Sequence, residues 1–183
     1  MFFFDFETFS TIDIRDVGAY RYAADLTTEV LLCGYAHDTD PVKMWDATDE
    51  MMPAEVEDAL RDQSVDLSAH NSPFERRIVE EVLGIPTDLE RWHDTMILAL
   101  TCGLPGALDL VCKALGFDED TAKLADGSRL INLFCKPAPK NHKARRYTSM
   151  HKPDDWARFI EYCRRDVEAA RRIWFELPHA VYN

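Results

Sequence analysis

Hydrophobic and polar positions alternate as in strands over much of the first half of the chain. The opening residues, MFFFDFE, form an apolar run that predicts a central strand, and residues 29–38 and 41–46 predict two more. The links between these segments are too short for helical crossovers, which favours an antiparallel meander. Residues 65–71 return to a strand-like pattern.

Helical spacing of apolar residues dominates the second half. Residues 53–63 and 72–84 predict helices within the strand-rich half, because apolar residues recur there every three or four positions. The last helix is predicted over about 24 residues from Pro153, with acidic residues in its first turns. Two short helices ending near glycine are predicted at 93–103 and 107–116, and residues 120–135 are ambiguous and helical in part.

Composition narrows the class of protein. A chain of 183 residues with 46% hydrophobic residues is long enough for one compact domain and short for two. There is no basic leader and no apolar run of about 20 residues, so neither secretion nor a membrane span is predicted. Five cysteines without a C-x-x-C pair favour reduced packing residues and a cytoplasmic location.

The charge of the chain is unevenly distributed. A net charge of −12 argues against a conventional DNA-binding protein. Residues 136–153 nevertheless carry six lysines and arginines and no acid, and three prolines predict a loop there. Such a segment is usually a solvated loop. Its position just before the last helix also suits contact with a nucleic-acid strand, where Tyr147 or Trp156 could stack on a base.

Two acidic residues stand out in the first predicted strand. Side chains alternate between the faces of a strand, so Asp5 and Glu7 share one face while Phe6 points to the other. Adjacent buried carboxylates repel each other unless a cation meets them. Either the strand end is frayed and both acids are solvated, or the pair binds a cation.

Two further segments combine residue types that can carry chemistry. Tyr162 and Asp166 are four residues apart on the last helix and therefore share a face. The segment HNSPFE contains Asn71, Phe74 and Glu75 where a strand runs into a helix. Each segment alone also suits an ordinary structure, a surface helix in the first case and a helix cap in the second.

Taken in order, FDFET, HNSPFE and YCRRD resemble the three exonuclease motifs of the DEDD superfamily, in its tyrosine-bearing branch. That branch includes the 3′-to-5′ proofreading domains of family A DNA polymerases, and the resemblance covers nearly the whole chain. DFETFSTIDIRDVGAYRYA and LFCKP look especially like polymerases of bacteriophages or prophages. The histidine-bearing branch is disfavoured, because it would place His where this chain has Glu161.

The resemblance implies an RNase H-like α/β fold, with a mixed five-stranded sheet flanked by helices, in a single exonuclease domain over residues 1–183. It implies removal of nucleotides from single-stranded DNA 3′ ends with two divalent ions, Mg²⁺ or Mn²⁺. The domain would be free-standing or joined to a polymerase domain in the same or another chain, in the host cytoplasm if phage-encoded. An exoribonuclease of the same superfamily and a non-catalytic nucleic-acid or partner-binding module remain alternatives.

The resemblance also assigns roles to residues. By analogy Asp5 bridges both ions, Glu7 and Asp166 complete the site on the nucleophile side, and Tyr162 orients the attacking water. By the same analogy Glu75 binds the second ion, and the family usually has Asp at this position.

Asp94 is a competing carboxylate for that second ion. The residues expected to bind nucleic acid are Thr8, Asn71, Phe74, Lys140, Lys143, Arg145 and Arg146.

Overall fold

The apolar opening segment is the central strand of a mixed sheet. The computed structural model describes residues 1–117 and 127–179. Strand β1 (Phe2–Phe9) pairs antiparallel with β2 (Glu29–His37) on one side and parallel with β4 (Leu67–Ala69) on the other. This confirms the central position predicted for β1.

Two short strands complete the sheet at its edges. Strand β3 (Lys43–Asp46) pairs antiparallel with β2, and β5 (Trp92–Asp94) pairs parallel with β4. The resulting order, β3-β2-β1-β4-β5, confirms the expected five-stranded mixed sheet and the antiparallel meander of its first three strands. The arrangement is an α/β fold consistent with the RNase H-like class.

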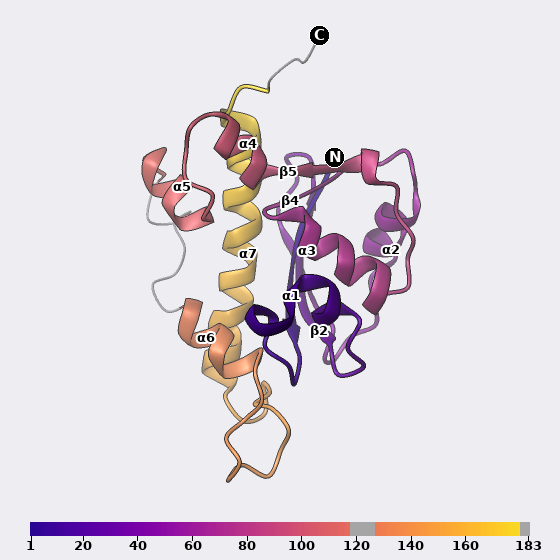
Figure 1. Cartoon of the computed structure of the whole chain (residues 1–183), viewed down its shortest axis with the longest axis vertical. Helices are drawn as coiled ribbons and strands as arrows, with labels where there is room; N and C mark the ends of the chain where they lie inside the picture. Colours follow the sequence, from indigo (N-terminus) through magenta and orange to yellow (C-terminus); the bar gives the residue numbers. More distant parts are fainter. Residues whose placement is uncertain (118–126, 180–183) are drawn as a thin grey trace.

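Helices cover both faces of this sheet (Figure 1). Helix α7 packs on β1 and β2 and also contacts α4, α5 and α6, while α1, α2 and α3 lie on the opposite side. Single turns of π-helix and 3-10 helix, η1 (Ile78–Val82) and η2 (Leu89–Arg91), connect α3 to β5. The α-helices are α1 (Ile14–Ala23), α2 (Ala54–Arg61), α3 (Ser72–Arg77), α4 (Thr95–Thr101), α5 (Leu108–Ala114), α6 (Gly127–Phe134) and α7 (Pro153–Glu176).

The structure differs from the sequence prediction at two elements. Helix α1 lies in the link between β1 and β2, where no helix was predicted, and the two strands pair antiparallel as predicted. The segment predicted as a helix from residue 93 begins instead with strand β5, because its backbone pairs with β4. Of the ambiguous segment, residues 127–134 are helix α6, and residues 120–126 lie outside the described part of the chain.

The alternation of β1 side chains separates the core from the acidic face. Phe2, Phe4 and Phe6 pack in the cluster formed with α1 and α2. On the face toward α7, Asp5 pairs across the sheet with Gly34. A Cβ atom at Gly34 would lie 2.9 Å from Cγ2 of Val167 in α7, so this glycine allows the helix to lie close to the sheet beside Asp5.

None of the helices in the described residues is long and apolar enough to cross a membrane.

Candidate metal centre

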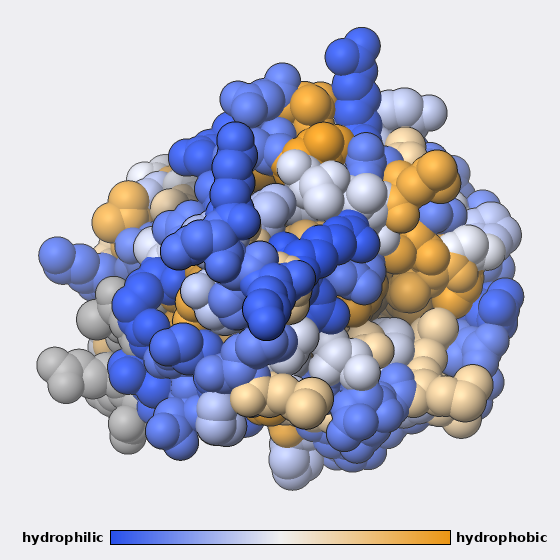
Figure 2. Space-filling model, turned by 90° about the horizontal axis from the view of Figure 1, so that it is seen from below, coloured by the Kyte–Doolittle hydropathy of each residue, from blue (hydrophilic) through white to orange (hydrophobic). Residues whose placement is uncertain are grey.

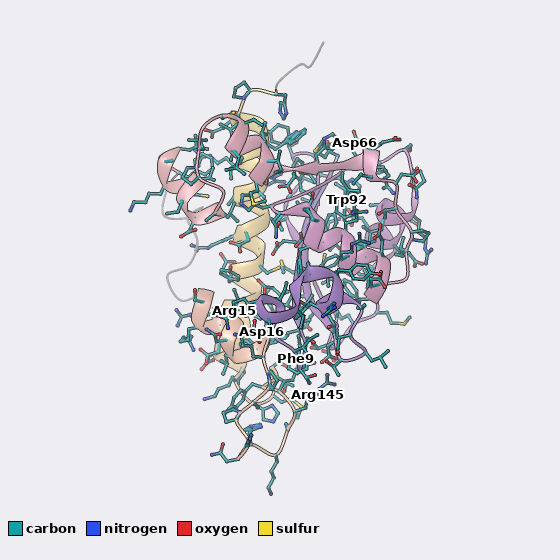
Figure 3. All side chains as sticks on the ribbon, viewed as in Figure 1. Phe9, Arg15, Asp16, Asp66, Trp92 and Arg145 are labelled. Carbon is teal, nitrogen blue, oxygen red and sulfur yellow. The ribbon has the colours of Figure 1, made fainter. Side chains whose placement is uncertain are left out.

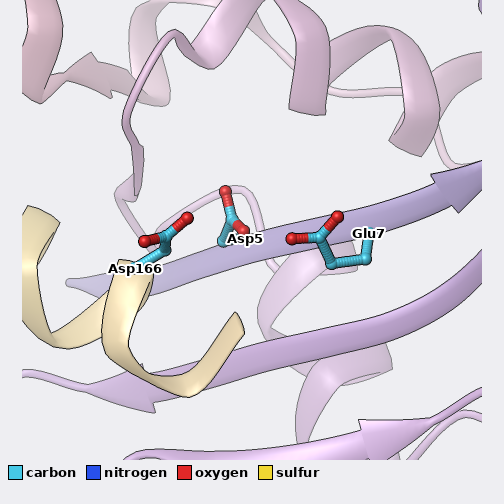
Figure 4. Close-up of side chains that lie close together, drawn as sticks. All are labelled: Asp5, Glu7 and Asp166. Atoms are coloured by element: carbon cyan, nitrogen blue, oxygen red, sulfur yellow. The ribbon is translucent and has the colours of Figure 1, made fainter. Parts of the chain in front are cut away.

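Three carboxylates from two elements distant in sequence meet on the face of the sheet under α7. Asp5 and Glu7 come from β1 and Asp166 from α7, and one oxygen of each lies within 4.8 Å of the others. Figure 4 shows the three side chains converging on one space between strand and helix. Glu7 and Asp166 are buried and Asp5 is half-buried. The paired acids predicted from the sequence therefore do share a site.

Carboxylates this close repel one another unless a cation lies among them. Oxygen ligands of this kind suit hard divalent cations better than soft metals, which prefer thiolates. The buried cluster can hold a metal ion, and the chemistry of its three oxygen donors fits one.

Glu75, in α3, is a further buried carboxylate and lies outside this close group. Its side chain is 2% exposed, and Oε2 has no hydrogen-bond partner among residues 1–117 and 127–179. Burial, reinforced by the charge of Asp5, raises the pKa of the Glu75 carboxyl well above its ordinary value. A buried acceptor without a partner calls for a proton or a cation.

Tyr162 lies one helical turn before Asp166 and is 2% exposed. Its hydroxyl donates a hydrogen bond to the Asp166 carboxylate. Burial, together with the charges of Asp166 and Glu7, raises the pKa of Tyr162 far above its ordinary value. Tyr162 therefore remains a neutral hydrogen-bond donor beside the carboxylate cluster at any physiological pH.

Cys135, the residue after α6, is a contact of the site that the sequence analysis did not predict. Its Sγ donates to Oε2 of Glu7 over 3.7 Å. Burial, followed by the charge of Glu7, raises the pKa of the Cys135 thiol, so it stays protonated and able to donate. The two residues are 128 positions apart. Local pattern carries no signal for such a contact.

Pockets open on two sides of the carboxylates. The first is lined mainly by apolar groups, and Phe74 and Tyr22 lie in it beside Glu7 and Thr8. The Thr8 and Tyr22 hydroxyls are hydrogen-bonded at 2.9 Å. The second pocket is more polar and is lined by several residues, including Asp5, Asp166, Asn71, His70 and Asp109. Thr8, Asn71 and Phe74, all predicted to bind nucleic acid, thus border pockets that reach the carboxylate cluster.

The basic segment of residues 136–152 forms a loop at the lower end of the molecule (Figure 1). Seen from below, this end is mostly hydrophilic (Figure 2). Lys140 and Lys143 are exposed. The Arg145 guanidinium lies 4.8 Å over the Phe9 ring (Figure 3). It also donates to the Thr27 carbonyl.

Arg146 is also used within the protein, because it donates to Glu29 at 2.9 Å. Trp156 is 4% exposed, and its indole nitrogen donates to Asp46 at 2.7 Å. The expectation that Trp156 could stack on a base is therefore wrong, whereas Tyr147 is partly exposed.

The chain is 39% identical over 173 residues to a DNA polymerase of Bacillus phage SP02, and the match covers 92% of the chain. The chain is homologous to part of a phage DNA polymerase. It spans about a quarter of that relative, because the match covers 26% of the polymerase. No family model matches the chain.

Asp94, the competing carboxylate, accepts hydrogen bonds from several backbone amides. It caps α4 by accepting from the Met96 amide at 2.8 Å, and it accepts from the amides of Asn71 and Ser72 at 3.0 and 2.9 Å. These bonds tie the start of α3 to the start of α4. They explain Asp94 as a structural anchor of the junction that carries Asn71 and Glu75.

We expect Asp94→Ala to lower the free energy of unfolding by about 2–4 kcal/mol, since a helix cap and two further bonds to a charged acceptor are lost. Urea denaturation followed by circular dichroism measures this change. Asp88→Ala is the matched control, because Asp88 precedes a helical turn but its side chain makes no capping hydrogen bond. Its replacement should change the free energy of unfolding little. Equal stability of the two variants would contradict the anchoring role.

Proposed function

We propose that the chain is a metal-dependent exonuclease domain that removes nucleotides from the 3′ end of single-stranded DNA, as a proofreading activity of a polymerase or as a free-standing enzyme. The observation that carries the proposal is that the carboxylates of Asp5, Glu7 and Asp166 lie together in one site. Tyr162 is hydrogen-bonded to Asp166 in that site. Homology to part of a DNA polymerase supports it. The proposed domain comprises residues 1–183.

The donor set supports binding of two divalent cations, Mg²⁺ or Mn²⁺. Asp5 would be shared by both, Glu7 and Asp166 would complete the first site, and Glu75 would serve the second with its unpartnered oxygen. Two such ions, when bound, would supply an activated water and neutralise charge on the departing 3′ oxygen.

The chain's own residues would position the substrate and the water. Tyr162 is a buried, neutral donor, which suits a group that orients a water molecule. The pocket beside Glu7 is lined by Phe74 and Thr8 and is mainly apolar, which suits an unstacked terminal nucleotide. Asn71 would hold the strand from the second pocket.

The basic loop would guide the strand toward these pockets. Lys140 and Lys143 are exposed and suit phosphate contacts. Arg145 and Arg146 are assigned the same role, and their bonds to Thr27 and Glu29 would hold the loop in place while other guanidinium donors face the strand. A polymerase domain in the same or another chain would be the natural partner.

The direction of cleavage and the need for a strand end test this function directly. A 5′-labelled single strand should shorten as a ladder from its 3′ end in Mg²⁺ or Mn²⁺, and a circular single strand should persist. A matched RNA strand is included to distinguish a deoxyribonuclease from a ribonuclease. Cutting of the circle, or faster loss of the RNA strand, would contradict the proposal.

We expect Tyr162→Phe to slow cleavage about 10–100-fold, because only the hydroxyl that orients the water is removed. Metal affinity should stay within a few-fold, since the carboxylates remain. Rates with saturating substrate and calorimetric metal titration check this. If metal binding is lost instead, Tyr162 supports the structure of the site rather than the water.

A further inference from the structure

Helix α6 begins directly against the ring of Tyr162. A Cβ atom built on Gly127 would lie 2.4 Å from Cε2 of Tyr162 and 2.9 Å from its Cδ2. Carbon atoms in contact are normally about 3.5–4.0 Å apart. No side chain fits at position 127 unless the ring or the helix moves.

Backbone geometry does not explain this glycine. Gly127 has no positive φ, unlike Gly18 and Gly84, so an L-residue could adopt its conformation. Glycine within a helix is less stable than alanine by about 0.5–1 kcal/mol. The close approach to Tyr162 is therefore the physical reason for glycine at this position.

Neither partner in this contact is free to withdraw. Leu130 and Phe134 of α6 are buried, and the Phe134 ring stacks on Phe159 of α7 at 5.2 Å between centroids. Phe159 in turn stacks on Tyr162, with 8° between the ring planes. Both α6 and the tyrosine ring are thus packed against the same part of α7.

We propose that Gly127 is a positioning residue for Tyr162: its missing side chain lets α6 pack on the ring and direct the hydroxyl at Asp166. The inference rests on the proposed function in that it concerns the tyrosine assigned to orient the water. A methyl group at position 127 would displace the ring and with it the hydroxyl, while leaving the three carboxylates in place.

The first test compares cleavage kinetics. Gly127→Ala should lower kcat about 10–100-fold, as Tyr162→Phe does, with KM and the metal-titration midpoint unchanged. The double variant should be no slower than the slower single variant, because both act through one hydroxyl. Ser128→Ala, an exposed position on the same helix, is the control and should retain the parent rate. A parent-like rate for Gly127→Ala would overturn the proposal.

The second test needs no activity. Gly127→Ala should lower the thermal unfolding midpoint of the metal-free protein when Tyr162 is present, and should leave it unchanged or raise it in a Tyr162→Leu background. If Gly127→Ala alone fails to fold and the double variant with Tyr162→Leu folds, the result shows the same coupling more strongly. An equal loss in both backgrounds would overturn the proposal.

Together the tests separate the two proposals. If the parent protein cleaves no nucleic acid, the proposed function fails, and the stability coupling still decides whether Gly127 and Tyr162 are in contact as described. Coupling without any change in kcat would make the contact purely structural and would overturn the positioning role.

Discussion

Asp5→Ala should reduce cleavage by about 10³-fold or more and leave the protein folded. Asp5 belongs to the close group and is also the charged neighbour that raises the pKa of Glu75 most, so its loss removes several kcal/mol of transition-state stabilisation from both proposed ion sites. The metal-free variant should be as stable as the parent or more so, because repulsion with Glu7 and Asp166 is relieved. Single-turnover rates and thermal unfolding with and without Mg²⁺ check both expectations.

Metal-induced stabilisation is the control that separates binding from chemistry. The parent should unfold at a higher temperature as the metal concentration rises, since a ligand that binds only the folded state stabilises it. Asp5→Ala should lose most of this shift. Asp58→Ala, an exposed carboxylate on α2, should keep it. Unchanged turnover in Asp5→Ala would exclude a site built on the three carboxylates.

Glu75→Gln should stabilise the metal-free protein at neutral pH. The pKa of Glu75 is raised in the folded state by burial and by Asp5, so above pH 4.5 the folded protein binds more protons than the unfolded chain. The contribution of Glu75 to stability therefore falls as the pH rises from 4.5 toward the raised pKa. Glutamine resembles the protonated acid, so the variant avoids this loss of stability. Urea denaturation of the parent and of Glu75→Gln at several pH values between 4 and 8 measures the difference in the free energy of unfolding.

The same position should behave oppositely once metal and substrate are present. Glu75→Asp should preserve or improve cleavage, because it restores the carboxylate usual in the family that the chain resembles. Glu75→Ala and Glu75→Gln should each lose about 10²-fold, partly recovered by Mn²⁺. An Ala variant with parent rates at limiting metal would rule out the role assigned to Glu75.

The sequence by itself determined the central strand, the long last helix and two pairs of neighbouring side chains, Asp5 with Glu7 and Tyr162 with Asp166. Alternation in β1 placed Asp5 and Glu7 on one face, and the 3.6-residue period of α7 placed Tyr162 beside Asp166. These relations are local, so they can be calculated from spacing alone. That the strand and the helix face each other followed from the resemblance of the three motifs, not from spacing.

Other features were decided only by the tertiary structure. Cys135 donates to Glu7, and Gly127 lies against Tyr162, because α6 packs where it does on α7. The role of Asp94 as an anchor depended on backbone amides 22 and 23 residues away. Strand β5 exists because β4 lies beside it, although two of its three residues, His93 and Asp94, were predicted as the start of a helix.

The physical reason is the same in each case. A hydrogen bond or a close contact between distant segments depends on where the backbones lie in space, and residue type and periodicity report only which face of an element a side chain occupies. The sequence could thus identify Glu75 and Asp94 as two candidate carboxylates. Only packing showed that the Asp94 carboxylate accepts hydrogen bonds from backbone amides. By contrast, Oε2 of Glu75 is buried without a hydrogen-bond partner among the described residues.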